Sequence, residues 1–319
     1  AHQPEALAFL DQAEDFYAAA TSRFAANPLL TYYSFLNLGK AALRTLGFTG
    51  SLDRARHGLS EQTAPGGVEL ADSTVVVRDG GNAVNVFSEL VDQLGFARPT
   101  NNQLLPVTEL LPQVVVGHRI WKEAEPGNEE RFVAIDEIEI VDDRATKNVW
   151  LRLYLARGDL SRYDITRRRL LDEGQLTGVF HEVAVKGTGR DPAVFLCLEQ
   201  MAPVTYTGRP TDVLMDLVDT CRTRLWRIAT SVPESGYRKY YIHMTPPGET
   251  ARLPQLASLW ALFYYFGSVV RYRPHLFDSI TAGSYGAFVT EFVSAQAEQF
   301  LYLLASEMQA REVAKPAII

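Results

Sequence analysis

Apolar side chains recur at helical spacing near the start of the chain. Leu7, Leu10 and Ala13 lie on one stripe of an amphipathic helix that begins at Pro4. The next segment, residues 28–46, is apolar on almost every side, a pattern typical of a helix with little solvent contact. The N-terminal part of the chain is therefore predicted to supply two helices, of which the second is buried.

A similar pattern returns in the last third of the chain. Residues 211–228, 254–270 and 285–312 predict three helices, and the second of these is apolar nearly all round. That segment approaches the length of a membrane span, which is the alternative interpretation. Pro254 and Gln255 at its start favour a buried helix of a water-soluble protein, so no membrane association is expected.

Between these helical sections the pattern predicts strands, separated by Gly, Pro, Asn and Asp. Residues 48–66 look irregular, and residues 85–94 form a short helix. The predicted strands are 68–78, 114–116, 131–141, 149–155, 179–186, 194–198 and 237–244.

Runs of strand between runs of helix favour an α+β fold over alternating βαβ units. We expect the N-terminal section, residues 1–100, to pack with the C-terminal section, residues 211–319, into one helical core. The strand-rich section, residues 101–210, would be an insertion in that core.

Composition narrows the possible partners. The 319 residues carry a net charge of −7, which argues against affinity for nucleic acid over the whole surface, although a local basic pocket remains compatible with it. Two cysteines are too few for a disulfide framework, and no signal-peptide pattern opens the sequence. We therefore expect a cytoplasmic protein with reduced thiols.

One candidate polar site begins on the buried helix of residues 28–46. Tyr33, Asn37 and Lys40 follow at a spacing that places them near one face of this helix. A lone ammonium group in such a helix is costly unless it is paired or faces a cavity. The pattern therefore favours these three residues as ligand contacts.

Three further polar residues complete this candidate site. Arg271 and Arg273 end the apolar helix of residues 254–270, and His57 lies in the loop after the first buried helix. If they converge with Lys40, they form a cationic pocket suited to phosphate or carboxylate. The alternative is structural: both arginines cap helix carbonyls and pair with core carboxylates, while His57 bonds to its own loop.

Several familiar chemistries are absent from the sequence. Gly39 and Lys40 do not end a phosphate-binding loop, because Ser34 and Ala41 stand where that motif needs Gly and Ser or Thr. His181 is followed by Glu182 without a second His at the spacing of a zinc site. We expect no cofactor and no metal site, and we interpret the acidic run at residues 136–143 as a solvated strand edge.

Three stretches, residues 27–41, 57–59 and 253–274, together resemble the YaaC-like family of bacterial proteins. The resemblance covers both terminal thirds, but the family has no settled biochemical role to carry over. Its helical part is similar to HEPN-type domains, many of which are RNases or RNA-binding modules in toxin and anti-phage systems. The resemblance therefore implies an accessory or effector protein of bacterial defence that binds RNA or a nucleotide.

HEPN nucleases typically combine an Arg with a His four to six residues further on, at a helix terminus. The resemblance implies Arg271 as the phosphate clamp and His275 or His57 as the proton-transfer group. Here only three residues separate Arg271 from His275, and Pro274 interrupts the helix between them. This departure favours the alternative hypothesis, a non-catalytic interaction or scaffold protein that docks a protein partner or a second copy. Whether the protein is an enzyme stays open.

Overall fold

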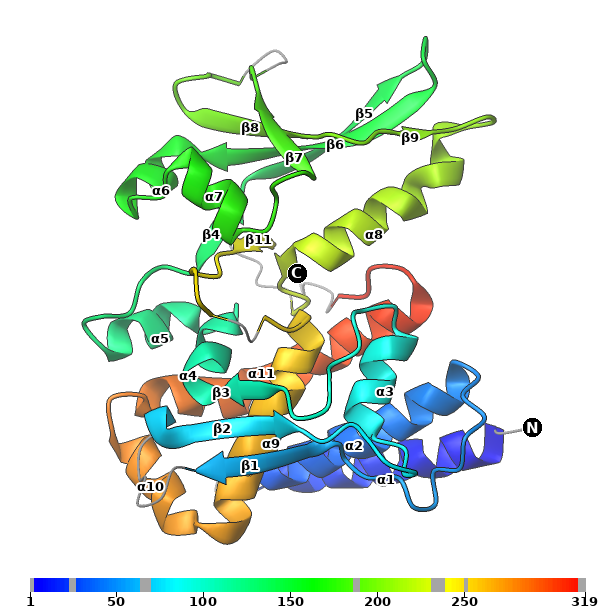
Figure 1. Cartoon of the computed structure of the whole chain (residues 1–319), viewed down its shortest axis with the longest axis vertical. Helices are drawn as coiled ribbons and strands as arrows, with labels where there is room; N and C mark the ends of the chain where they lie inside the picture. Colours follow the sequence, from blue (N-terminus) through cyan, green and yellow to red (C-terminus); the bar gives the residue numbers. More distant parts are fainter. Residues whose placement is uncertain are drawn as a thin grey trace. The chain divides into compact units, whose positions relative to one another are not determined.

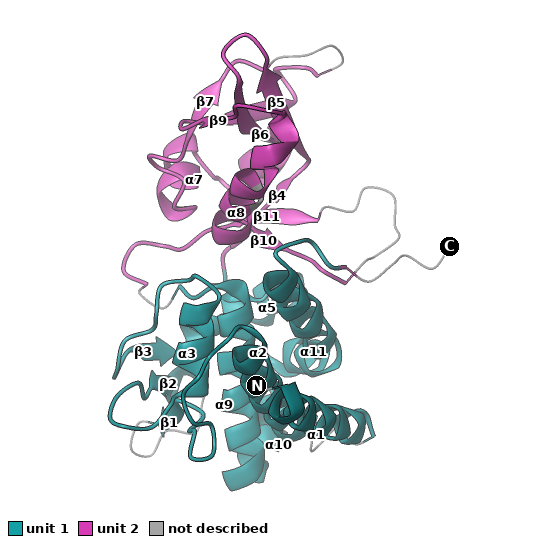
Figure 2. Cartoon of the chain, turned by 90° about the vertical axis from the view of Figure 1, so that its right-hand side faces the viewer, with its two compact units in different colours: residues 1–128, 250–313 teal, residues 129–249, 314–319 magenta. Residues whose placement is uncertain are grey.

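The computed structural model describes residues 3–22, 27–63, 70–185, 190–230, 239–249 and 252–314. The chain forms two compact units, coloured separately in Figure 2. Unit 1 combines residues 1–128 with residues 250–313, and unit 2 comprises residues 129–249 and the chain from residue 314. These boundaries differ from those predicted: residues 101–128 belong to unit 1, and residues 211–249 belong to unit 2.

Helices from both ends of the chain build unit 1. Here α2 packs against α1, α9 and α11, and α9 also contacts the strand β1, as Figure 1 shows. The predicted α+β fold, with a helical core formed by the N- and C-terminal sections, is confirmed. These helices are α1 (Gln3–Thr21), α2 (Asn27–Thr45), α9 (Gln255–Tyr272), α10 (Pro274–Ala282) and α11 (Gly286–Gln309).

Aromatic side chains fill the core between α2, α9 and α11. The ring centroids of Phe35 and Phe263 lie 5.0 Å apart, and those of Phe263 and Phe292 lie 4.6 Å apart. Each such buried ring stabilises the fold by roughly 1.5–3 kcal/mol. Gly39 sits against this core, because a Cβ atom there would come within 2.4 Å of the Trp260 ring. The missing side chain at Gly39 therefore lets α2 approach α9 closely.

Shorter elements cover the rest of unit 1. An antiparallel sheet has the order β1-β2-β3, and its register pairs Leu59 with Val77. The elements are β1 (Leu59–Thr63), η2 (Leu70–Asp72), β2 (Ser73–Val77), α3 (Val86–Gln93), β3 (Leu104–Pro106), α4 (Val107–Leu110), η3 (Leu111–Gln113) and α5 (His118–Ala124).

Two predictions for this part were wrong. Residues 48–66 were expected to be irregular, yet β1 forms there, because this short strand depends on pairing with β2 and only Leu59 of its residues is buried. Residues 114–116 were expected to be a strand, but they form a bend and turn between η3 and α5. Their apolar character reflects burial, which a short apolar run shows in a turn as readily as in a strand.

Unit 2 holds two further antiparallel sheets, with the orders β5-β6-β8-β7, where β9 also pairs with β6, and β10-β11-β4. The elements are β4 (Phe132–Ile135), β5 (Glu137–Asp143), β6 (Asn148–Ala156), α6 (Arg157–Arg162), α7 (Arg167–Glu173), β7 (Phe180–Val183), β8 (Phe195–Gln200), β9 (Val204–Thr205), η4 (Pro210–Val213), α8 (Leu214–Arg224), β10 (Trp226–Arg227) and β11 (Tyr240–His243).

Alternation along β6 divides the larger sheet into two faces. Leu151 and Leu153 point into the apolar core, while Arg152 and Tyr154 lie on the opposite face. Arg152 donates to Glu199 of β8 at 2.6 Å, so ion pairs join the strands on this face. The acidic run predicted as a solvated strand edge is β5, which pairs with β6 alone among the described strands.

Two expectations about the whole chain bear on its class. Within the described residues, no helix has the length and apolar character needed to cross a membrane, and α9 is instead a core helix. Cys197 and Cys221 are both free thiols. Burial raises the pKa of Cys221 to about 11. A thiol held in its protonated form in this way is a weak nucleophile.

Candidate anion-binding site

The crossing of α2 and α9 brings together two residues of the candidate site, Tyr33 and Arg271. Gly267 lies at this crossing, where a Cβ atom would come within 3.2 Å of the Leu29 Cα atom and the Pro28 carbonyl oxygen. One turn further along α9, Arg271 reaches α2, and its Nη1 atom donates to the Tyr33 hydroxyl at 2.6 Å. The two predicted residues Tyr33 and Arg271, far apart in sequence, are therefore in contact.

His57 lies on a tight loop that the next residue makes possible. Gly58 has a φ of +84°, which favours glycine, and the Arg78 N–H donates to its carbonyl at 2.8 Å. The Leu59 N–H donates to His57 Nδ1 at 3.2 Å. A backbone N–H can only donate, so Nδ1 must be unprotonated and the ring proton of the neutral imidazole lies on Nε2.

Aromatic rings surround this imidazole. The His57 ring centroid lies 5.3 Å from that of Tyr264 and 6.4 Å from that of Tyr32, and the Tyr32 and Tyr33 centroids are 5.6 Å apart. Burial and then the neighbouring Tyr264 and Tyr33 hydroxyls raise the pKa of Tyr32 well above its usual value. The Tyr32 hydroxyl is buried and has no hydrogen-bond partner among the described residues.

Three arginines around this ring cluster lack a carboxylate partner. Among the described residues, Arg56, Arg78 and Arg271 form no ion pair, and the Arg78 guanidinium bonds only to the neutral Ser60 and Asn102 side chains. Desolvation lowers the pKa of His57, although part of the ring is exposed, and the positive charges of Arg271 and Arg56 act in the same direction. A neutral His57 at pH 7 follows.

Arg273 behaves as the structural alternative predicted. Its guanidinium forms an ion pair with Glu61 of β1, whose side chain is only 10% exposed. Thr63 also donates to this carboxylate at 3.2 Å. Arg273 therefore ties the end of α9 to β1 and neutralises the acidic group next to the loop of His57.

The other predicted residues lie outside this group. Lys40 is two turns of α2 beyond Tyr33, with its Nζ atom 5.1 Å from the Phe9 ring centroid, and burial lowers its pKa. The Asn37 amide donates to the Tyr33 carbonyl at 3.0 Å, within α2. His275 is exposed near the start of α10. Within the described residues, no hydrogen bond or ion pair joins these three side chains to Arg271 or His57.

A sequence model of YaaC-like proteins matches residues 1–308. The chain belongs to the YaaC-like protein family. No curated protein and no solved structure matches it. The region matched by the family model contains most of both units of this YaaC-like protein and every residue of the candidate site described above.

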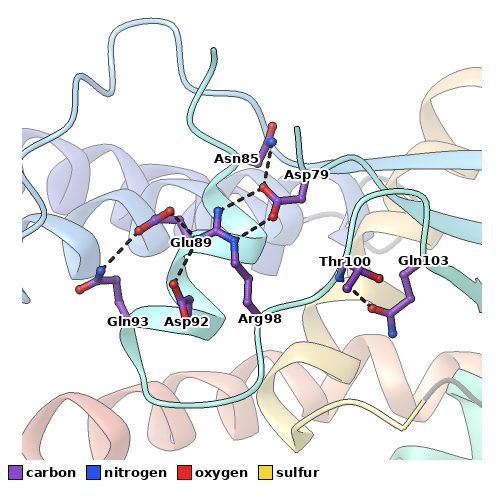
Figure 3. Close-up of polar contacts among 8 residues, drawn as sticks. All are labelled: Asp79, Asn85, Glu89, Asp92, Gln93, Arg98, Thr100 and Gln103. Carbon is purple, nitrogen blue, oxygen red and sulfur yellow. Dashed lines mark hydrogen bonds and ion pairs between the residues drawn. The ribbon is translucent and has the colours of Figure 1, made fainter. Parts of the chain in front are cut away.

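A second arginine centre in unit 1 of this YaaC-like protein shows a contrasting arrangement (Figure 3). Arg98 binds Asp79 through two nitrogens at 2.8 and 3.1 Å, Glu89 at 2.9 Å and Asp92 at 3.1 Å. Asn85 also donates to Asp79 at 3.3 Å. This network fixes the loop that follows Arg78 and leads into α3, so it helps to position Arg78.

Sequence reasoning missed several members of the cluster. Tyr264 is two turns before Arg271 on α9, and Arg56 adjoins His57, so spacing alone carried a signal for both. Arg78 approaches His57 only through the β1–β2 pairing, which the sequence did not reveal. Across the described residues, no three metal-ligating side chains gather closely enough to hold an ion.

Proposed function

We propose that this YaaC-like protein binds a phosphate-bearing ligand, RNA or a nucleotide, at the cluster of Arg56, His57, Arg78 and Arg271. The observation that carries the proposal is the pairing of Arg271 with the neutral Tyr33 hydroxyl at 2.6 Å, with no carboxylate in ion-pair distance among the described residues. A guanidinium left without a counter-ion in a protein of net charge −7 is suited to an incoming anion.

The chemistry of the cluster favours binding over cleavage. A general base needs a free lone pair, but the His57 Nδ1 lone pair accepts the Leu59 N–H and the Nε2 atom carries the proton. His57 is therefore suited to donate a hydrogen bond to a phosphate oxygen. A role as a HEPN-like accessory or effector protein in bacterial defence fits such binding and rests on the family resemblance. Proton transfer by His275 has no support from contacts within the described residues.

Calorimetric titration of the purified protein with adenine nucleotides and short RNAs tests the proposal directly. A ligand at a hundred times its dissociation constant should also stabilise the folded protein by about 2.7 kcal/mol. Arg271→Ala should abolish the binding heat while the variant keeps the circular dichroism spectrum of the parent. Arg168→Ala is a matched control for lost charge, because its side chain is 93% exposed on α7 of the other unit.

Two outcomes would contradict the proposal. The first is a well-folded parent protein that binds none of these ligands. The second is a ligand that binds Arg271→Ala as tightly as it binds the parent.

The second candidate function is protein interaction through α1. Leu7 and Leu10 lie on the outer face of this helix with 50% and 45% of their surface exposed. Large apolar side chains exposed one turn apart are typical of a docking face. Sedimentation of the parent protein and of Leu10→Glu should show an assembly that dissociates in the variant if a second copy binds there. Equal sedimentation of both as monomers would contradict self-association.

A further inference from the structure

Three arginines of unit 1 without a carboxylate partner among the described residues lie around the adjoining rings of His57 and Tyr264. Arg56 adjoins His57 in sequence, the Arg78 backbone bonds to Gly58, and Arg271 reaches the same place from α9. The charges of Arg271 and Arg56 act on the His57 imidazole, and the charge of Arg78 acts on Tyr264, whose ring packs against His57. A long single-stranded RNA gains affinity from a row of phosphate contacts along a groove, whereas a concentrated charge is suited to one compact polyanion.

The groups around these rings are hydrogen-bond donors. Arg271 and Arg78 have donors only, and His57 offers its Nε2–H. The Tyr33 hydroxyl accepts from Arg271, so its own proton is left to donate outward. The carboxylate of Glu61 on β1 is already occupied by Arg273 and Thr63. Such a set complements a group with acceptors alone, and a fully ionised phosphomonoester carries three such terminal oxygens.

An aromatic platform lies beside the charges. Tyr272 follows Arg271 directly, is 68% exposed, and its ring centroid lies 5.0 Å from the Arg271 guanidinium carbon. An exposed ring of this kind can stack on a nucleobase, and the adjacent guanidinium strengthens the stack. Hydrogen-bond donors suited to phosphate and an aromatic stacking surface thus lie next to each other at the end of α9.

We infer that the preferred ligand is a small nucleotide with a terminal phosphomonoester, held by Arg271, Arg78 and His57 and with its base on Tyr272. The inference rests on the proposed function and narrows it, because an internal phosphodiester of RNA has one charge fewer and only two terminal oxygens.

The test compares ligands that share a base and differ in the phosphate. Adenosine 5′-monophosphate, adenosine 3′,5′-cyclic monophosphate, adenosine and a short oligoadenylate with a 5′-hydroxyl end are titrated calorimetrically into the 319-residue chain. We expect the 5′-monophosphate to bind about tenfold or more tightly than the cyclic diester. Adenosine should show no measurable binding.

Substitutions at Tyr272 separate stacking from charge. Tyr272→Ala should weaken the 5′-monophosphate about fivefold or more and leave the affinity for inorganic phosphate unchanged, whereas Tyr272→Phe should retain the affinity of the parent. Arg168→Ala again controls for a lost surface charge.

The results distinguish the narrower inference from the proposed function. If the oligoadenylate or the cyclic diester binds as tightly as the 5′-monophosphate, the terminal-phosphate inference is wrong and phosphate binding stands. If none of the four ligands nor inorganic phosphate binds, both fall. Loss of affinity for inorganic phosphate in Tyr272→Ala would also overturn the assignment of Tyr272 to the base.

Discussion

Two arginines of unit 1 sit in opposite surroundings. Arg98 is held by three carboxylates (Figure 3), while Arg271 bonds to a phenol and lies over a tyrosine ring, with no carboxylate beside it in the described residues. Both side chains reach the surface. The comparison teaches that two arginines at the surface of one unit can differ in whether a carboxylate already occupies the guanidinium.

The two regions also differ in their local charge. Three carboxylates around Arg98 carry one negative charge each, so an incoming anion meets net repulsion there. In the other region the charges of Arg271 and Arg56 act on the neutral His57 ring, and the charge of Arg78 acts on the neutral Tyr264 ring. The Arg98 network fixes a loop, whereas the region of Arg271 concentrates positive charge around His57 and Tyr264.

The largest expected effect on stability is at Gly39, where α2 packs closely against α9 and α3. Gly39→Ala would bring a methyl group within 2.4 Å of Trp260 on α9 and 3.1 Å of Val86 on α3. We expect a loss of about 1–3 kcal/mol in the free energy of unfolding by urea, because the rigid indole cannot move aside. Gly127→Ala is the control, since nothing lies within 4 Å of its added carbon. Equal stability of the two variants would show that α2 and α9 are less closely packed than described.

Arg98→Ala should have the next largest effect, about 1–2 kcal/mol at pH 7, because it leaves three carboxylates facing one another. Arg271→Ala removes no ion pair and should cost less stability. Urea unfolding of both variants measures the difference, and a larger loss for Arg271→Ala would reverse the comparison.

The effect of Arg98→Ala should depend on pH in a defined direction. The hydrogen bonds from Arg98 hold the pKa of Asp79 below its usual value. The stabilisation is therefore complete above the unfolded pKa of about 3.9 and is lost as the pH falls through the folded pKa. We expect the gap between parent and Arg98→Ala to shrink between pH 5 and pH 3. A gap that widens on acidification would exclude Asp79 as the main partner.

The smallest expected effect is at Tyr32. Tyr32→Phe removes a buried hydroxyl that has no partner among the described residues, so the free energy of unfolding should stay constant or rise by up to about 1 kcal/mol. Tyr265→Phe is the matched control, because the Tyr265 hydroxyl donates to Ser73 at 3.2 Å and its loss should cost about 1 kcal/mol. Equal destabilisation of both would mean that Tyr32 has a bonding role.

The helical pattern of the sequence predicted the fold, but the strand boundaries that depend on pairing between distant segments were not predicted. The apolar surfaces of α2 and α9 carry a helical period, so their burial was readable from local pattern. β1 and the break between β4 and β5 at Asp136 depend on partners that lie far along the chain. Long-range register leaves little trace in a single sequence.

The same limit applied to the site. The contact of Tyr33 with Arg271 follows the predicted convergence, since both residues end up at the crossing of two buried helices. Lys40 shares α2 with Tyr33, but it lies two turns away beside Phe9, where burial lowers its pKa. Helical spacing predicts on which face of a helix a residue lies. Which part of a neighbouring helix that residue contacts depends on how the two helices pack.

The split of unit 1 between two chain segments sets an order for biosynthesis. Residues 129–249 are continuous and leave the ribosome before α9 does, so unit 2 has all of its strands while α2 still lacks its partners α9 and α11. Tyr33 and Arg271 are separated by 238 positions in the sequence. The nascent chain must therefore keep the apolar flanks of α2 from aggregating until α9 has been translated, and the contact between Tyr33 and Arg271 forms only after unit 2 has left the ribosome.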